Sequence, residues 1–403
     1  MGSVLVVTEL YWPKGGGAEL ATHLIVDILR KEYDVIVVTG TRNPSKLQGV
    51  NYIYEPLLSK HEKPLLWLNT LRLLKTQRFQ KILAVSDVVY IPRYAFPLIP
   101  HAKKLGKKVI IHLHDYIPIS YTSVILAPYE RHKGRIIRDD LTIECIKGFK
   151  YCSAAHLFWW APKTVTKWIE QADKIICVSE RQADIIIDQV PELKDRIVVI
   201  YNPIPPELLN TNPLKKEMGA FPTLLYVGGD NYIKGFHVLL QALNILEHRG
   251  LRANIIFTNK YSSKSLEILN RMKEKLKNVN LEVAGRVKYN ELLRLHRKAQ
   301  ALIFPSIWEE TFGYSVIEAI FLNTIPIFSR VGALPELLAK TPVINSMFTP
   351  GNAKQLADKI ENFLTLSESS IEKIASETKI KILEHLSSKN PEILIPKIYR
   401  LIT

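Results

Sequence analysis

Short runs of consecutive apolar residues recur along this chain and alternate with stretches in which apolar residues are spaced three and four apart. The runs predict strands buried on both faces, and the wider spacing predicts helices with one buried face. The predicted strands cover residues 4–7, 35–38, 109–115, 172–179, 198–204, 223–230, 254–257 and 301–304. Helical spacing follows at residues 18–30, 238–247 and 291–299. The alternation of strand and helix in both halves predicts an α/β protein with two doubly wound parallel sheets.

The length of 403 residues exceeds what one ordinary hydrophobic core supports, so two domains are expected. Pro203, Pro205 and Pro206 interrupt the pattern midway, because proline continues neither a helix nor an inner strand. We therefore predict an N-terminal Rossmann-like domain over residues 1–206 and a second Rossmann-like domain over residues 207–380. Residues 381–403 are expected to form a terminal helix.

The most informative stretch is the strand-to-helix turn of residues 305–318, which follows the predicted strand at residues 301–304. Open parallel sheets bind ligands at such carboxyl-end turns, and the amides that begin a helix favour an anion or a polar oxygen. Glu310 in the turn and Glu318 in the helix are separated by seven residues. Carboxylates only accept hydrogen bonds, so this pair can hold the hydroxyls of a sugar or ribose. The alternative is that both acids belong to a solvated helix cap.

Two glycine-rich turns also follow predicted strands. Gly16 and Gly17 end a run of three glycines after the first strand, and Gly228 and Gly229 follow the strand that opens the second half. Glycine lets the backbone approach a ligand closely, and Lys234 beyond the second turn is suited to a phosphate. An ordinary flexible turn and an ordinary surface lysine are the alternatives.

His114 ends another central strand and is followed by Asp115. A histidine at the carboxyl end of a strand, on the same side of the sheet as the first glycine turn, is a candidate for site chemistry. A histidine that is simply packed in the core remains the alternative.

The block around Glu310 and Glu318 resembles the Glu-x7-Glu signature of the retaining glycosyltransferases of family 4, which have the GT-B fold. The resemblance runs over nearly the entire chain and implies two facing Rossmann-like domains with a cleft between them. It implies that Glu310 holds the donor sugar, that Glu318 binds the ribose and that Lys234 binds the diphosphate. His114 is then expected beside the reacting carbon, and the terminal helix is expected to cross back to the first domain.

The same resemblance assigns further donor contacts. The amides of Phe312, Gly313 and Tyr314 are expected to support the sugar or phosphate, and Arg286 and Val287 resemble the turn that holds the nucleobase. Gly229 stands where the family has an arginine that clamps the diphosphate together with the lysine. The chain therefore lacks one of two expected cations, and another cation must compensate or turnover is weakened.

The net charge of +15 is unevenly placed along the chain, with a local excess in one window of the first half. From Lys60 to Lys108 there are eleven Lys and Arg residues against two acidic ones. Residues 63–83 read as one amphipathic basic helix, which can lie on an anionic membrane or pack on the sheet with a solvated basic face. No aromatic stacking platform is interleaved, so nucleic acid is not expected as a partner. No apolar run reaches the length of a membrane span, and no signal peptide is recognised.

Three cysteines, at positions 145, 152 and 177, are too few for a disulfide scaffold and indicate the cytosol. We expect them to be buried thiols rather than zinc ligands. No Asp-x-Asp motif is present, so no metal and no cofactor beyond the donor substrate are predicted.

These observations predict a metal-independent hexosyltransferase that uses a UDP- or GDP-sugar and a glycan or polyprenyl-linked acceptor. It would be cytoplasmic and peripheral at the inner membrane face. The alternative is a catalytically reduced subunit that binds a nucleotide sugar or scaffolds a transferase complex.

Overall fold

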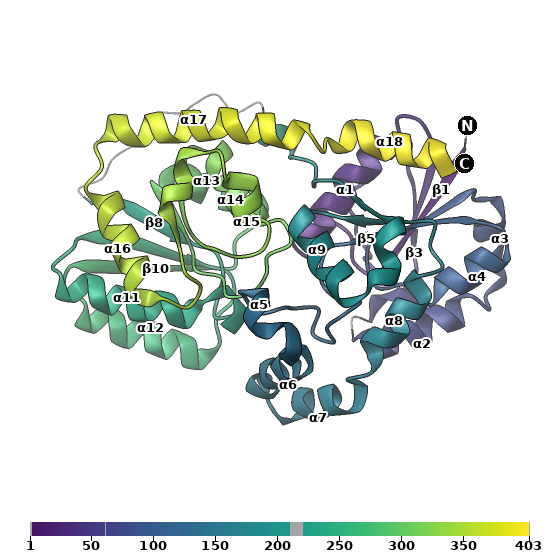
Figure 1. Cartoon of the computed structure of the whole chain (residues 1–403), viewed down its shortest axis with the longest axis horizontal. Coiled ribbons are helices and arrows are strands. Elements are labelled where there is room, and N and C mark those ends of the chain that lie inside the picture. Colours follow the sequence, from purple (N-terminus) through teal and green to yellow (C-terminus); the bar gives the residue numbers. More distant parts are fainter. Residues whose placement is uncertain (1, 61, 210–220, 403) are drawn as a thin grey trace. The chain divides into compact units, whose positions relative to one another are not determined.

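A computed structural model describes residues 2–60, 62–209 and 221–402, which fall into two compact units (Figure 1). The first unit comprises residues 1–125, 133–203 and 388–403, and the second comprises residues 126–132 and 204–387. Each unit is organised around one parallel sheet.

The sheet of the first unit has the order β3-β2-β1-β4-β5-β6-β7 within the described residues. Its strands are β1 (Ser3–Thr8), β2 (Asp34–Thr39), β3 (Asn51–Tyr54), β4 (Val88–Ile91), β5 (Lys108–Leu113), β6 (Lys174–Cys177) and β7 (Ile197–Val199). Its helices are α1 (Gly17–Leu29), α2 (Lys63–Leu73), α3 (Gln77–Val85), α4 (Leu98–Lys104), α6 (Ile136–Lys147), α7 (Phe149–Phe158), α8 (Ala161–Ile169), α9 (Glu180–Gln189) and α18 (Pro391–Ile402).

Continuous apolar strands give this unit its core, as the sequence pattern predicts. Val4 pairs with Val35 on one side and with Val88 on the other, and all three side chains are buried. The C-terminal helix α18 completes this core, because Ile395 and Tyr399 are fully buried in the same apolar cluster. Figure 1 shows α18, in yellow, lying along α1.

The sheet of the second unit has the order β10-β9-β8-β11-β12-β13 within the described residues. Its strands are β8 (Thr223–Tyr226), β9 (Ala253–Thr258), β10 (Val279–Gly285), β11 (Ala301–Phe304), β12 (Ile325–Ser329) and β13 (Met347–Phe348). Its helices are α5 (Tyr129–His132), α10 (Pro206–Leu209), α11 (Phe236–His248), α12 (Ser263–Lys275), α13 (Tyr289–Lys298), α14 (Tyr314–Phe321), α15 (Leu334–Leu338), α16 (Ala353–Leu364) and α17 (Glu368–Ser387).

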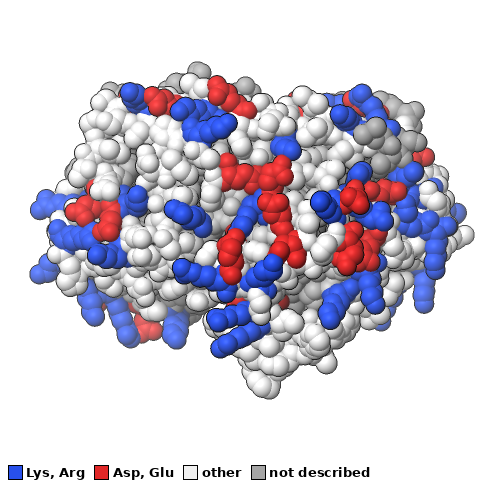
Figure 2. Space-filling view, in the orientation of Figure 1, with Lys and Arg blue, Asp and Glu red and all other residues white. Residues whose placement is uncertain are grey.

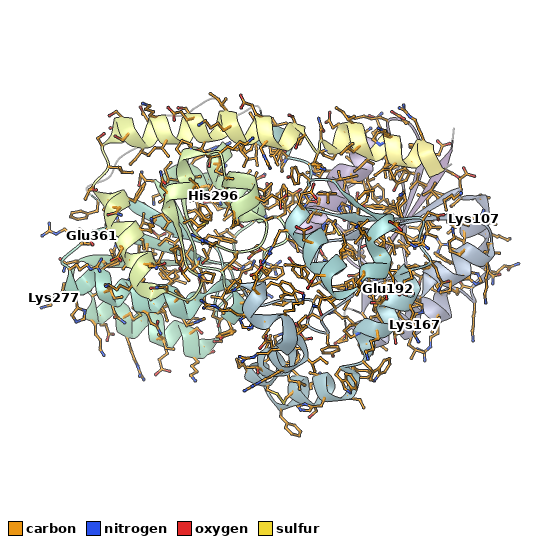
Figure 3. The ribbon with its side chains drawn as sticks, in the orientation of Figure 1. Lys107, Lys167, Glu192, Lys277, His296 and Glu361 are labelled. Atoms are coloured by element: carbon orange, nitrogen blue, oxygen red, sulfur yellow. A yellow bond between two sulfur atoms is a disulfide. The ribbon has the colours of Figure 1, made fainter. Side chains whose placement is uncertain are left out.

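Strands β8 and β11 are neighbours in this sheet, so the loops that follow them lie at the same edge. The helices are held to one another by apolar packing and by ion pairs at the surface. Arg249 at the end of α11 pairs with Glu361 on α16, which Figure 3 labels.

Several elements differ from the sequence predictions. The single helix predicted over residues 63–83 is wrong, because α2 ends at Leu73 and α3 begins at Gln77. Thr76 separates them, and its hydroxyl accepts a hydrogen bond from the amide of Phe79 at 3.4 Å. Residues 381–403 are not one helix either, since α17 belongs to the second unit and α18 to the first.

None of the described helices combines the length and the apolar character that a membrane crossing requires.

Candidate functional site

Glu310 lies in the loop between β11 and α14 and is only 4% exposed. Its Oε1 atom accepts three hydrogen bonds, from the hydroxyl of Ser306 at 2.8 Å, the indole nitrogen of Trp308 at 2.6 Å and the ammonium group of Lys234 at 2.6 Å. The carboxylate predicted from the sequence is therefore turned into the protein and held by a charged partner, as a preorganised site requires.

Lys234 reaches Glu310 because the loop after β8 packs directly against the loop after β11. The amide of Ile307 donates to the carbonyl of Ile233 at 2.9 Å. A side chain at Gly235 would place its Cβ 1.8 Å from the carbonyl oxygen of Pro305, so only glycine permits this approach. The ammonium group also lies 5.2 Å from the centre of the Trp308 ring.

The backbone conformation and close packing of the glycine turn in the second unit leave no room for a side chain at positions 228 and 229. Gly229 has φ +62°, and a Cβ there would lie 2.7 Å from the carbonyl oxygen of Lys260. The hydroxyl of Tyr226 donates to the carbonyl of Gly229 at 2.9 Å, and it would clash with a Cβ on Gly228. The backbone at position 229 therefore disfavours an arginine, which accounts physically for the departure from the family pattern.

Glu309, beside Glu310, serves the loop backbone. Its two carboxylate oxygens accept hydrogen bonds from the amide of Tyr129 at 2.6 Å and from the amide of Gly332 at 2.7 Å. Gly332 in turn lies against Glu310, and the amide of Ala333 donates to the carbonyl of Glu310 at 2.8 Å. Glu309 was not singled out from the sequence, because the sequence does not show which of two adjacent acidic side chains points to the loop backbone and which points to the site.

Glu318 lies in α14 and is 4% exposed, with Oε1 accepting a hydrogen bond from the hydroxyl of Tyr289 at 2.9 Å. Burial raises the pKa of Glu318 to about 7, the bond from Tyr289 opposes this shift, and the charge of Glu207 adds to it. The group therefore changes protonation near neutral pH. Neither acid of the pair is turned to solvent.

The other residues predicted to contact the donor in this unit fall into two groups, one at the start of α14 and one after β10. Gly313 caps α14 with φ +81°, between the buried rings of Phe312 and Tyr314, which meet edge to face at 5.2 Å. The turn of these three residues therefore leads into the helix that carries Glu318. Arg286 and Val287 directly follow β10 at the edge of the sheet, and Arg286 is exposed.

In the first unit, Gly16 caps α1 and Gly17 begins it. The amide of Gly16 donates to Oε2 of Glu19 at 2.6 Å, and the other oxygen of Glu19 binds Arg93. Arg93 also pairs with Glu9 at 2.5 Å. Burial works against the charge of Arg93, but the two acids outweigh it and raise its pKa. An ion triad of two buried acids and the partly buried Arg93, absent from the sequence prediction, thus holds the glycine turn.

His114 follows β5 and lines a cavity of about 120 Å³ in the first unit. Its ring stacks on His112 at 4.2 Å, and Nδ1 of His112 bonds to the hydroxyl of Tyr90 at 2.8 Å. Burial lowers the pKa of His114 well below its ordinary value, and the charges of His112 and Arg93 lower it further. His114 is therefore a neutral imidazole that can exchange hydrogen bonds with a ligand. The cavity is lined by Ala18, Pro92, Arg93, Tyr94, Phe96, His112, Leu113, His114, Asp115 and Ile117.

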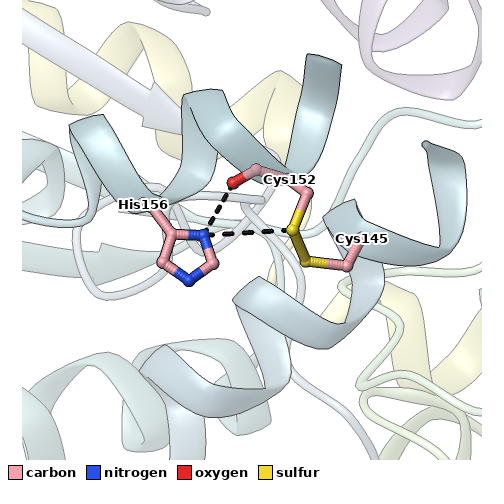
Figure 4. A group of neighbouring side chains, drawn as sticks. All are labelled: Cys145, Cys152 and His156. Carbon is pink, nitrogen blue, oxygen red and sulfur yellow. Dashed lines mark hydrogen bonds between the residues drawn. A yellow bond between two sulfur atoms is a disulfide. The ribbon is translucent and has the colours of Figure 1, made fainter. Parts of the chain in front are cut away.

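Two of the three cysteines depart from the prediction of buried thiols. Cys145 and Cys152 form a disulfide, and neither belongs to the buried core (Figure 4). Only Cys177 among the described residues is a free, buried cysteine. Cys145 and Cys152 lie on consecutive helices joined at Gly148, a proximity that their spacing alone does not show.

Two family models match the chain. The model described as Glycosyltransferase Family 4 matches residues 14–208, and the model described as Glycosyl transferases group 1 matches residues 214–379. The chain is a glycosyltransferase of the group 1, family 4-like class that these two models describe. The family resemblance stated from the sequence is thereby confirmed.

Solved structures of this glycosyltransferase class share the fold. Sucrose-phosphate synthase of Thermosynechococcus elongatus is 14% identical, with a TM-score of 0.74 over 100% of this chain and 99% of that chain. HepE of Anabaena, solved with UDP-glucose, is 15% identical, with a TM-score of 0.68 over 99% of each chain. WaaG, described as a glycosyltransferase involved in lipopolysaccharide biosynthesis, is 16% identical, with a TM-score of 0.68 over 99% of each chain. The chain has the GT-B fold, as predicted.

A relative detected by sequence is an uncharacterized 42.6 kDa protein in the cps region of Klebsiella pneumoniae. It is 23% identical over 364 residues, which cover 85% of this chain and 89% of that protein.

Proposed function

We propose that this glycosyltransferase moves a hexosyl group from a UDP- or GDP-sugar to a glycan or polyprenyl-linked acceptor, with retention of the anomeric configuration. The observation that carries the proposal is the buried Glu310 carboxylate joined to Lys234 at the carboxyl ends of β11 and β8. Glu310 would accept hydrogen bonds from the hydroxyls of the sugar, and Lys234 would neutralise the departing diphosphate. The likeness to HepE, which was solved with UDP-glucose, supports the donor class.

The chemistry asks the protein to stabilise a positively charged sugar and a departing anion at the same time. A carboxylate and an ammonium group held 2.6 Å apart supply charges of both signs at one place. When donor binds, the ammonium group would turn from Glu310 toward the diphosphate, and Glu310 would exchange that partner for sugar hydroxyls. Ser306 and Trp308 would keep the carboxylate in place meanwhile.

The proposal is tested by a panel of nucleotide sugars in a thermal-shift assay, because a ligand that binds only the folded state raises the melting temperature. The donor found in this way is then incubated with lipid-linked glycans, and NMR gives the anomeric configuration of the product. An inverted anomer would contradict retention. Loss of activity with EDTA that added Mg²⁺ restores would contradict metal independence.

A catalytically reduced subunit is the second candidate, and Gly229 favours it because the family arginine is missing. The main chain of Lys260 lies against this turn, since its carbonyl oxygen accepts a hydrogen bond from the amide of Asp230 at 3.3 Å, and its side chain is exposed. We infer that Lys260 supplies the second cation. Lys260→Ala would then lower transfer with little change in stability, whereas an inactive wild-type chain that still binds donor would favour the reduced subunit.

The proposed acceptor implies peripheral contact with an anionic membrane, and exposed apolar side chains of the first unit support it. Leu65, Leu68 and Leu71 are 38, 46 and 47% exposed and share one face of α2. Phe149 on α7 is 87% exposed and Leu157 is 65% exposed. On the face that Figure 2 shows, the lower tip of the lobe that contains α6 and α7 is mostly uncharged, with basic residues above it. Such a surface can insert side chains at the lipid headgroups.

Co-sedimentation with vesicles tests this contact. The wild-type chain should pellet with anionic vesicles and much less with zwitterionic ones. One double variant combines Leu68→Ser with Leu71→Ser, and a second combines Phe149→Ser with Leu157→Ser. Both should pellet less than the wild type. Ile380→Ser, at a 59% exposed position on α17, is the control and should pellet like the wild type. Equal pelleting of all variants would contradict the assignment of this surface.

A further inference from the structure

The disulfide between Cys145 and Cys152 joins the end of α6 to the start of α7. Cys145 lies in the last turn of α6, and Cys152 lies in the first turn of α7. Gly148 separates the helices with φ +125°, a conformation that side chains rarely allow. The amide of Cys152 donates to the carbonyl of Gly148 at 3.1 Å, so the tight corner holds both cysteines at one place.

His156 adds a third candidate ligand to the same place, as Figure 4 shows. It follows Cys152 by one helical turn, so the two side chains share a face of α7. Nδ1 of His156 lies 3.9 Å from the Sγ atom of Cys152 and 2.8 Å from its carbonyl oxygen. One ligand atom from each of the three residues lies within 4.8 Å of the other two.

These distances suit a tetrahedral metal ion. Zinc binds cysteine sulfur at about 2.3 Å and histidine nitrogen at about 2.0–2.1 Å, which places neighbouring ligand atoms roughly 3.5–3.8 Å apart. The separation of Nδ1 and Sγ is close to this value, and rotation of the cysteine side chains brings the two sulfurs to it once their bond is open. The 2.8 Å contact with the carbonyl of Cys152 requires the proton on Nδ1. Metal binding therefore breaks this hydrogen bond and moves the proton of the neutral imidazole to Nε2, which leaves Nδ1 with a lone pair for the metal.

The surroundings favour thiolates over competing ligands. Cys152 lies among the first amides of α7, and a helix N-terminus stabilises a thiolate. The neighbouring Glu144 is engaged by Lys147 at 2.6 Å. Two thiolates and an imidazole form a donor set that binds zinc in preference to magnesium or calcium.

We propose that the reduced thiolates of Cys145 and Cys152 bind a Zn²⁺ ion together with His156, and that the disulfide and the ion are alternative links between α6 and α7. A small-molecule dithiol gives two electrons and two protons to the disulfide, so the S–S bond breaks to leave Cys145 and Cys152 as thiols, and the two sulfurs of the dithiol join in a disulfide of their own. Each thiol then loses a proton to solvent as its sulfur binds the metal. A water molecule fills the fourth position. The sequence predicted no metal here, and this site is independent of the proposed donor chemistry.

The test uses the full chain, reduced with a phosphine that is then removed under anaerobic conditions, and titrated with Co²⁺. One Co²⁺ per chain should bind and give a thiolate-to-cobalt charge-transfer band together with intense visible bands of tetrahedral geometry. Added Zn²⁺ should abolish these bands. The oxidised chain should bind no Co²⁺ at this site.

Three variants assign the ligands. Cys152→Ser should lose the charge-transfer band, and His156→Ala should lower the Zn²⁺ affinity by at least about 10- to 100-fold, because even the loss of a group that only hydrogen-bonds to a ligand costs this much. Cys177→Ala is the matched control, because burial raises the pKa of that thiol and keeps it from binding metal. Its Co²⁺ spectrum should equal that of the wild type.

Several results would overturn the proposal. One is a reduced chain that shows three titratable thiols after unfolding but binds no Co²⁺ when folded. Another is an unchanged spectrum in Cys152→Ser, or binding by the oxidised chain. Should Cys152→Ser not fold by circular dichroism, Cys145→Ser and His156→Gln decide in its place, and wild-type spectra from both would reject the site.

Discussion

Lys234 and Glu310 are 76 residues apart in the sequence, yet Nζ of the lysine lies 2.6 Å from Oε1 of the glutamate. The pairing follows from the order of the strands, since β8 and β11 are neighbours and their following loops meet at one edge of the sheet. A donor that binds here must replace this ion pair. Its diphosphate and its sugar hydroxyls are groups that can do so.

The first prediction concerns this pair. Glu310→Gln and Lys234→Met should each weaken donor binding by about 10- to 150-fold, because a hydrogen bond to a charged group is worth about 1.5–3 kcal/mol. Isothermal titration calorimetry with the donor measures the loss. Lys277→Met, at an exposed position labelled in Figure 3, is the control and should bind like the wild type. If both site variants bound the donor with wild-type affinity, Glu310 and Lys234 would not be donor-binding residues.

The second prediction concerns the protonation of Glu318. Burial raises its pKa from 4.5 to about 7 in the folded chain. Between these values the folded chain binds more protons than the unfolded chain, so the free energy of unfolding falls as the pH rises across this window. Glu318→Gln should remove at most about 3 kcal/mol of this dependence. Urea unfolding at about pH 5 and about pH 7.5 measures it.

An exposed acid on the same sheet supplies the control for Glu318. Glu282→Gln, on the edge strand β10, should leave the pH dependence as it is in the wild type. The ionisation of Glu318 also links to ligand binding, because ribose hydroxyls would donate to its charged form. Donor binding near pH 7 should then release protons, so the observed enthalpy should vary with the ionisation enthalpy of the buffer. An enthalpy that is independent of the buffer would contradict this role.

A third prediction compares two glycines that both have positive φ. A Cβ on Gly332 would lie 1.9 Å from the carbonyl oxygen of Glu310, whereas a Cβ on Gly351 would meet nothing within 4 Å. Gly351→Ala should therefore cost only the backbone strain, about 1 kcal/mol. Gly332→Ala should cost clearly more and should displace Glu310, so that donor affinity falls as well. Equal melting temperatures for the two variants would contradict this prediction, because the loop that contains Glu310 would then have moved without losing stability.

The fourth prediction concerns the ion triad under the glycine turn. Arg93→Met leaves Glu9 and Glu19 buried without their cation, and breaking such a group costs about 3–5 kcal/mol. Arg271→Met is the comparison, since its pair with Glu267 is exposed and should change stability by no more than about 0.5 kcal/mol. Urea unfolding of both variants measures the difference, and a loss of similar size in the two would contradict the importance of burial.

The sequence predicted most of the strands that local pattern encodes, although the buried apolar run of β4 was missed. Strands β1 and β8 are apolar runs and were found, whereas β3 has half-exposed side chains and β13 has only two residues, so neither gives a run to detect. Thr76 did carry a local signal for the break between α2 and α3, because a threonine before a helical stretch is a frequent cap.

In the candidate site, too, some residues could be predicted from the local sequence and others only from the folded chain. Glu310 and Lys234 stand at recognisable positions in turns after strands, and Glu318 lies in the helix that follows one of these turns. Arg93 does not, because its acidic partners lie 84 and 74 residues away and only the folded chain brings them together. The roles of the two neighbouring acids at positions 309 and 310 likewise depend on the direction of each side chain.

The assignment of α18 to the first unit has a consequence for how the protein can be made in parts. A fragment that stops near residue 203 would keep every strand of the first sheet but lack Ile395, Ile398 and Tyr399, and so would expose an apolar hollow where those side chains belong. A ribosome must therefore synthesise α18 before the first sheet can be fully covered. Separate expression of the N-terminal half calls for the last sixteen residues to be grafted on or supplied as a peptide.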